Sequence, residues 1–181
     1  MHKVVLYLAV SEQTIDRPLS HALRDRAAAL YFLEKPYAFI DTAPGEKPAL
    51  SISTEVCFSA THTKNLYLCA FSPYKPVGVD AEHLRRVPRK ERIAKKLFSA
   101  SALQEYLSAP EEEKETLFLK LWTRHEAQGK LLGKGVFFDP DEKGLAAPYF
   151  TDLTDDLPEG FFGTLCTPCP AEIEWRKLAE E

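Results

Sequence analysis

The sequence predicts an α+β fold made of two related halves, residues 1–86 and 87–181, that form one compact pseudo-dimeric unit. Three observations lead to this prediction. Apolar residues recur at helical spacing in two long segments, residues 18–33 and 118–135. Short segments rich in β-branched and aromatic residues lie between turn signals, as in small antiparallel sheets. The order strand, helix, loop, strands occurs once before Val87 and again after it.

Length and charge limit the classes of protein that this chain can be. At 181 residues with 45% hydrophobic content, the chain is large enough to fold alone, and we expect a monomer. Its net charge of -4 argues against general nucleic-acid binding. The apolar run near the N-terminus is too short to span a bilayer and lacks a cleavage pattern. We therefore expect a cytoplasmic protein that binds neither nucleic acid nor membrane.

The elements follow from local patterns along the chain. The first strand is predicted at residues 2–10, and a helix that begins at a proline follows at residues 18–33. Prolines break the segment 34–50, and two strands joined by a polar turn at residues 61–65 come next. After the helix at 118–135, we expect a strand at 136–138 and antiparallel strands at 149–150, 161–167 and 173–175. The four cysteines, of which Cys166 and Cys169 form a Cys-x-x-Cys pair, are interpreted as reduced thiols.

An alternating segment at residues 76–82 places two carboxylates together. On a strand, Val77, Val79 and Ala81 face inward, while Asp80 and Glu82 share the opposite face about 6 to 7 Å apart. Such a pair can bind a hard cation such as Mg²⁺, whose remaining ligands are water and phosphate oxygens. The alternative is a solvent-facing acidic edge. A third carboxylate arriving from elsewhere would favour the metal site.

Glu126 is the candidate for that third carboxylate. It continues the row of Phe118 and Trp122 along the helix, and Lys130 continues the row by one more turn. Charged residues therefore stand where the pattern predicts apolar ones, which indicates a site. The alternative is an ordinary ion pair on a solvated helix face.

Two further stretches offer cationic or polar donors. His62 lies between two threonines in the predicted turn, and such a group of donors suits a phosphate, although an ordinary polar turn has the same composition. Most side chains in the run 85–96 are basic, which indicates either a solvated helix face or a docking surface for an acidic partner.

Three motifs occur in an order that is typical of one family. They are residues 58–63 (FSATHT), 77–82 (VGVDAE) and 122–127 (WTRHEA), the last followed by Lys130. Together they resemble the signature of the 4'-phosphopantetheinyl transferase superfamily, of the longer single-chain Sfp-like kind, over roughly residues 47–135. The resemblance implies two pseudo-twofold-related halves with the active site at their interface. It also implies transfer of the phosphopantetheine arm of coenzyme A to a serine of an apo acyl, peptidyl or polyketide carrier protein.

The resemblance also implies roles for individual residues. Mg²⁺ would be held by Asp80, Glu82 and Glu126, with Glu126 and Lys130 as the catalytic pair: Glu126 is the base toward the serine, and Lys130 contacts the pyrophosphate. The expected contacts to coenzyme A are Lys47, Pro48, Thr61, His62, His125, Lys130 and Arg24. His125 stands where the family has lysine, and Glu46 replaces a loop glycine. These departures leave open a catalytically weak or inactive homologue that binds coenzyme A or a carrier, and a metal-dependent phosphohydrolase is a further alternative.

Overall fold

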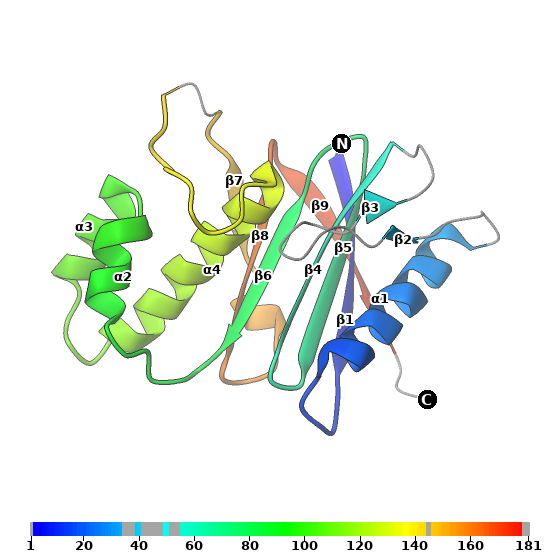
Figure 1. Ribbon diagram of the computed structural model, residues 1–181, viewed down its shortest axis with the longest axis horizontal. Coiled ribbons are helices and arrows are strands. Elements are labelled where there is room, and N and C mark those ends of the chain that lie inside the picture. Colours follow the sequence, from blue (N-terminus) through cyan, green and yellow to red (C-terminus); the bar gives the residue numbers. More distant parts are fainter. Residues whose placement is uncertain (1, 34–38, 41–48, 51–54, 144–145, 179–181) are drawn as a thin grey trace.

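The structure is a computed structural model that describes residues 2–33, 39–40, 49–50, 55–143 and 146–178. Figure 1 shows the arrangement of its helices and strands. The elements in chain order are β1 (His2–Val10), α1 (Arg17–Phe32), β2 (Phe39–Ile40), β3 (Ala49–Leu50), β4 (Val56–Thr63), β5 (Leu66–Pro73), β6 (Gly78–His83), α2 (Lys90–Leu97), α3 (Ala100–Ser108), α4 (Lys114–Leu132), β7 (Tyr149–Asp152), the short 3-10 helix η1 (Thr154–Asp156), β8 (Phe161–Thr167) and β9 (Ala171–Lys177). The predicted α+β class is confirmed.

Two larger sheets form the centre of the molecule. The first has the strand order β4-β5-β1-β9, and the second, which is antiparallel throughout, has the order β6-β8-β7. Two strands pair with a strand from the other side of the predicted boundary at residue 87. β6 precedes it in the chain but pairs with β8, and β9 follows it but pairs with β1. The division into two related halves, residues 1–86 and 87–181, therefore stays a prediction, and it does not coincide with the membership of the sheets.

The sheets are covered on their outer faces by helices, with a shared apolar layer between them. α1 packs on the first sheet and α4 on the second (Figure 1). Between the sheets, Leu6 and Leu68 from the first are in one cluster with Val79 and Leu165 from the second. A third cluster joins α2, α3 and α4. None of the helices in the described ranges is long and apolar enough to cross a membrane.

Several local predictions are corrected by the structure. The expected turn at 61–65 is shorter, because β4 continues through β-branched Thr61 and Thr63 and only Lys64, with φ of 52°, and Asn65 turn the chain. Residues 136–138 form no strand. β9 pairs with β1 in parallel, whereas an antiparallel strand was expected. The basic run becomes helical only at Lys90.

Other local predictions are confirmed. α4 runs through the predicted apolar stripe around Phe118. The structure also shows Ser99 capping α3, where its hydroxyl accepts a hydrogen bond from the Ala102 amide. All four cysteines are free. Within the basic run, Lys90 pairs with Glu115 and Lys95 with Glu91, so part of its charge is neutralised inside the chain.

Candidate active site

The candidate site lies where the edge strands of the two sheets, β4 and β6, run beside each other under α4. No backbone ladder joins β4 to β6; the Val79 amide instead donates to the Ser59 hydroxyl at 3.0 Å. On its other side β6 touches α4 very closely. A Cβ on Gly78 would lie 1.9 Å from the Ala127 carbonyl oxygen, so only glycine permits this approach. These two contacts bring residues of three elements within reach of one another.

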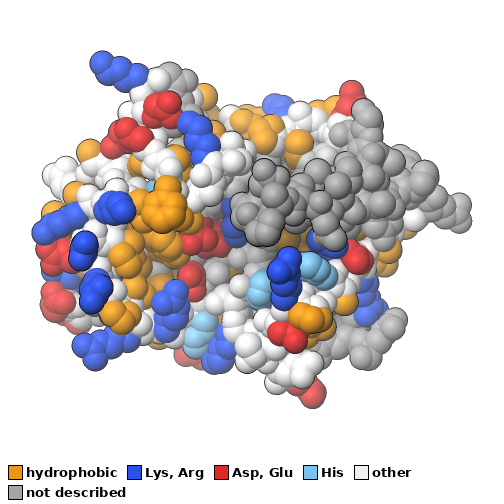
Figure 2. Space-filling view, viewed as in Figure 1, with side chains coloured by type: hydrophobic (Ala, Val, Ile, Leu, Met, Phe, Trp, Pro, Cys, Tyr) orange, Lys and Arg blue, Asp and Glu red, His pale blue; other side chains and the backbone are white. Residues whose placement is uncertain are grey.

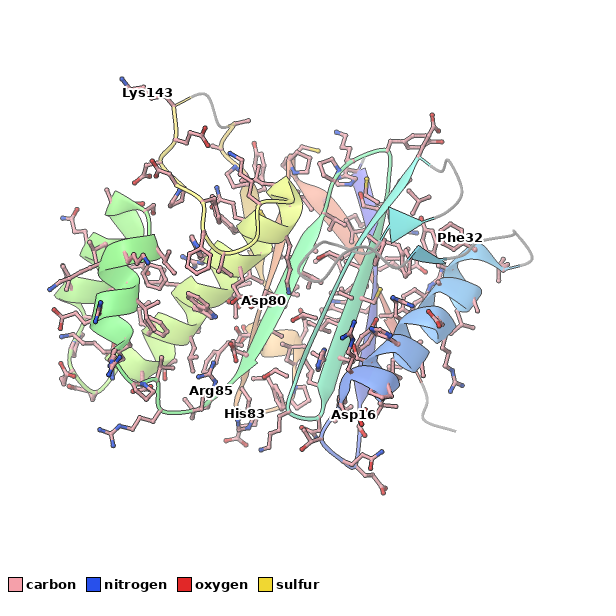
Figure 3. All side chains as sticks on the ribbon, viewed as in Figure 1. Asp16, Phe32, Asp80, His83, Arg85 and Lys143 are labelled. Carbon is pink, nitrogen blue, oxygen red and sulfur yellow. The ribbon has the colours of Figure 1, made fainter. Side chains whose placement is uncertain are left out.

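Asp80 is the centre of the polar cluster. It lies midway along β6 between α4 and β4 (Figure 3), and it is only 3% exposed. Its Oδ1 accepts two hydrogen bonds, at 3.0 Å from Thr61 Oγ1 and at 2.8 Å from Lys130 Nζ. Its Oδ2 is buried without a hydrogen-bond partner among the described residues. Asp80 is thus packed inside the protein.

Glu126 and Glu82 line the same pocket as Asp80 and Lys130, a cavity of about 320 Å³. Burial raises the pKa of Glu126 to about 7, the negative charge of Asp80 adds to the increase, and the Lys130 ammonium opposes it. Glu82 also raises this pKa, while its own carboxylate pairs with Arg85 at 3.0 Å. The confirmed inward packing of Val77, Val79 and Ala81 is what turns both acidic side chains of β6 toward this side.

The donor set suits a hard cation in part. The unpartnered Oδ2 of Asp80 is an oxygen that a cation would satisfy, and a cation would also relieve the repulsion between Asp80 and Glu126. Within the described ranges, however, no three acidic, histidine or cysteine side chains stand together in a ready ligand set. Mg²⁺ is commonly held by one or two carboxylates together with water and the phosphates of a substrate. The residues therefore fit Mg²⁺ if phosphate oxygens complete the shell.

A larger cavity of about 740 Å³ adjoins the carboxylate pocket and shares Thr61, His62 and Lys130 with it. Arg24 and Lys134 also line this cavity. The His62 Nδ1 lies 3.2 Å from the Ser20 hydroxyl, and burial, with the nearby Lys130 charge, lowers the pKa of His62. In the space-filling view, acidic side chains lie in the middle of this face, between the basic α2–α3 end and the histidines beside α1 (Figure 2).

Three of the predicted contacts are not described as part of this group. Lys47 and Pro48 lie outside the described residues. His125 does not line either of the two cavities. It is 5% exposed, its Nε2 lies 2.7 Å from the Val136 carbonyl oxygen, and its ring stacks on Phe138 with centroids 4.5 Å apart. The structure therefore does not bring His125 to the group around Asp80, and its contact with a phosphate stays a prediction.

Two features of the site were missed by sequence reasoning. The Thr61 hydroxyl donates to Asp80, so its single hydrogen is already used and cannot be donated to a phosphate in the same geometry. Ser20 was not named, although it precedes Arg24 by four residues on one helix face, and that spacing was a usable signal. The predicted set Asp80, Glu126, Lys130 and His62 is brought together as expected.

Comparisons with known proteins agree with this geometry. A family model described as the 4'-phosphopantetheinyl transferase superfamily matches residues 76–167, about half of the chain. The chain is 35% identical over 79 residues to the 4'-phosphopantetheinyl transferase HetI of Nostoc sp., covering 44% of this chain and 33% of that protein. It is 32% identical over 109 residues to psf-1 of Bacillus pumilus, covering 60% and 46%. For Sfp of Bacillus subtilis the values are 26% over 129 residues, covering 71% and 56%.

The matched region contains β6, α4 and β8, and hence Asp80, Glu126 and Lys130. The chain spans between a third and somewhat more than half of the length of these curated relatives. On the match to the family model, this chain belongs to the 4'-phosphopantetheinyl transferase superfamily.

Proposed function

We propose that this chain transfers the 4'-phosphopantetheine arm of coenzyme A to a serine hydroxyl of an apo carrier protein of the acyl, peptidyl or polyketide type. The observation that carries the proposal is the cluster of Asp80, Glu126 and Lys130, whose pocket opens into a cavity large enough for a nucleotide-sized ligand. Relatives that are named 4'-phosphopantetheinyl transferases support the same reaction class.

In the proposed reaction the serine oxygen forms a bond to phosphorus, and the bond from that phosphorus to the bridging pyrophosphate oxygen breaks. Adenosine 3',5'-bisphosphate leaves with the negative charge. Lys130 and His62 line the space where this charge would develop, so an ammonium and an imidazole N–H are available to stabilise it. Glu126 would take the serine proton as the general base, and in the metal-free site burial and the Asp80 charge raise its pKa, which favours acceptance of a proton.

Mg²⁺ would be held by Asp80, Glu126 and Glu82 with phosphate oxygens of coenzyme A. When bound, it would polarise the pyrophosphate and offset its charge. The unpartnered Oδ2 of Asp80 supports this assignment. Arg24 lines the larger cavity and is kept among the proposed coenzyme A contacts, whereas His125, which lines neither this cavity nor the carboxylate pocket, is left out of them.

The setting of the reaction is also part of the proposal. β4, β6 and α4 all come from one chain, so a monomer carries every proposed group. Four free cysteines suit a reducing compartment such as the cytoplasm. Because His125 lines neither of the two cavities, its difference from the family's lysine is weaker support for an inactive homologue.

The experiment incubates the chain with coenzyme A, Mg²⁺ and a panel of apo acyl, peptidyl and aryl carrier proteins. Intact mass spectrometry should show one carrier gaining the mass of the arm. A carrier whose acceptor serine is replaced by alanine, and a reaction with a chelator, are the controls. Breakdown of coenzyme A without any carrier would indicate a phosphohydrolase. Tight coenzyme A binding with every carrier unmodified would indicate a binding module and overturn the proposal.

A further inference from the structure

The hydrogen bond between Thr61 and Asp80 joins the two sheets at the candidate site. Thr61 stands on β4, and Asp80 stands on β6, nineteen residues later in the chain. Two residues before Thr61, Ser59 accepts the Val79 amide hydrogen at 3.0 Å. Ser59 and Thr61, two residues apart on β4, thus hold consecutive residues of β6. Ser59 holds the backbone amide of Val79, and Thr61 holds the side-chain carboxylate of Asp80.

The two oxygens of Asp80 are used unequally. Oδ1 accepts from both Thr61 and Lys130, whereas Oδ2 is buried with no hydrogen-bond partner in the described part of the chain. A buried carboxylate oxygen without a donor or a cation is unfavourable, so it marks where a ligand would gain most. The carboxylate could exchange its oxygens by rotating about its last bond if nothing fixed it.

Lys130 alone does not fix that rotation. Its Nζ also donates to the Val79 carbonyl oxygen at 3.1 Å, but from that position an ammonium with three rotating donors can serve either oxygen of the carboxylate. The Thr61 hydroxyl differs, because the β-branched side chain has few rotamers and its strand is tied to β6 through Ser59. A single hydroxyl donor with a fixed direction can select one oxygen over the other, whereas an ammonium with three donors is less selective.

We propose that Thr61 is a positioning residue, which holds Oδ1 of Asp80 so that Oδ2 is the oxygen presented to the divalent cation. Thr61 then acts on the reaction through Asp80. It differs from a phosphate ligand because its only hydroxyl hydrogen is donated to the carboxylate. This inference rests on the proposed function, since it concerns how the same pocket takes up its metal.

The test compares Thr61→Val, which removes the hydroxyl at nearly constant shape, with Thr61→Ser, which keeps it. Thr151→Val, on the exposed strand β7, is the control for the same chemical change elsewhere. Calorimetry with Mn²⁺ as the probe, in the presence of coenzyme A and without a carrier, measures metal affinity apart from activity. Transfer assays measure the Mg²⁺ concentration for half-maximal rate and the Michaelis constant for coenzyme A.

For Thr61→Val we expect the affinity for Mn²⁺ to fall by about tenfold and the Mg²⁺ concentration for half-maximal rate to rise by about tenfold. This is the scale of one lost charge-assisted hydrogen bond. The Michaelis constant for coenzyme A at saturating Mg²⁺ should change by less than about twofold, and Thr61→Ser should restore metal affinity. If Thr61→Val does not fold, Thr61→Ala gives the same readouts.

Two results overturn the inference in distinguishable ways. If the wild-type chain transfers the arm and Thr61→Val keeps its metal dependence while losing coenzyme A affinity, Thr61 is a phosphate ligand and the proposed function stands. If the wild-type chain neither binds Mn²⁺ nor modifies any carrier, the proposed function fails and the inference fails with it.

Discussion

Replacing Glu126 with glutamine should make the metal-free protein more stable at neutral and alkaline pH. Glu126 is half-buried in the same pocket as Asp80, and its pKa is raised from 4.5 to about 7. Glutamine keeps the shape of the side chain without the charge. The variant therefore removes a repulsion that the wild-type protein carries whenever Glu126 is ionised.

The size and sign of this effect follow from the pKa. Below pH 4.5 the side chain is protonated in both the folded and unfolded states, so Glu126→Gln should match the wild type. Between pH 4.5 and about 7 the folded wild type keeps a proton that the unfolded chain has lost, and its stability falls as pH rises. One pKa unit corresponds to about 1.4 kcal/mol. With a discount for partial solvent contact, the variant should gain about 2 kcal/mol above pH 7.

The assay is urea denaturation followed by circular dichroism, in a chelator, at pH values from about 5 to about 8. Glu112→Gln is the matched control, because Glu112 is exposed on the segment before α4. Its difference from the wild type should stay constant across the range. An advantage of Glu126→Gln that does not grow with pH, or a variant less stable than the wild type at the highest pH, would refute the electrostatic argument.

Three further predictions concern residues around the pocket. Asp80→Asn should abolish transfer while the chain stays folded, because the amide keeps the shape but not the charge; full activity, measured by carrier mass, would remove Asp80 from the mechanism. Gly78→Ala should lower the free energy of unfolding by about 3 kcal/mol, because its Cβ would meet the Ala127 carbonyl at 1.9 Å; wild-type stability in urea would contradict this close approach. His125→Lys should cost about 2 kcal/mol of stability and leave coenzyme A affinity unchanged, because the ring is buried on Phe138; tighter coenzyme A binding in calorimetry would contradict this.

Much of the carboxylate arrangement was predictable because the β6 pattern is local. Alternation along a strand has a period of two, so the burial of Val77, Val79 and Ala81 places Asp80 and Glu82 on the other face whatever the sheet pairs with. The apolar row of α4 likewise gave the placement of Glu126 and Lys130. Both patterns depend on the residues of one strand or one helix alone, so they can be recognised in the sequence without knowing the tertiary structure.

The pairing of strands was less predictable because it depends on contacts far apart in the chain. β9 joins β1 in parallel at the far end of the sequence, and no local pattern distinguishes this from an antiparallel neighbour. The expected strand at 136–138 failed for a related reason. Apolar residues there suit a strand, but the Val136 carbonyl is bonded to His125, and the chain passes over α4 without entering a sheet.

The position of His125 shows where a helical motif stops being informative. Successive residues on an α-helix are about 100° apart, so Glu126 and Lys130, four residues apart, share one face. His125 is turned by about 100° from Glu126, and whether that direction faces the cavity depends on what packs beside the row. In this chain Val136 and Phe138 pack there and cover the ring, which is why the neighbour of a site residue is itself a core residue.

The pairings inside the site could not be inferred from the motifs that name its members. Thr61, Asp80 and Lys130 come from three motifs, and the bonds between them span nineteen and fifty residues of sequence. These bonds form only because Gly78 lets α4 approach β6 and Ser59 ties β6 to β4. The geometry of the Asp80 carboxylate therefore depends on how both sheets pack. A substitution at Gly78 or Ser59 should accordingly alter metal binding, although neither residue is a proposed metal ligand.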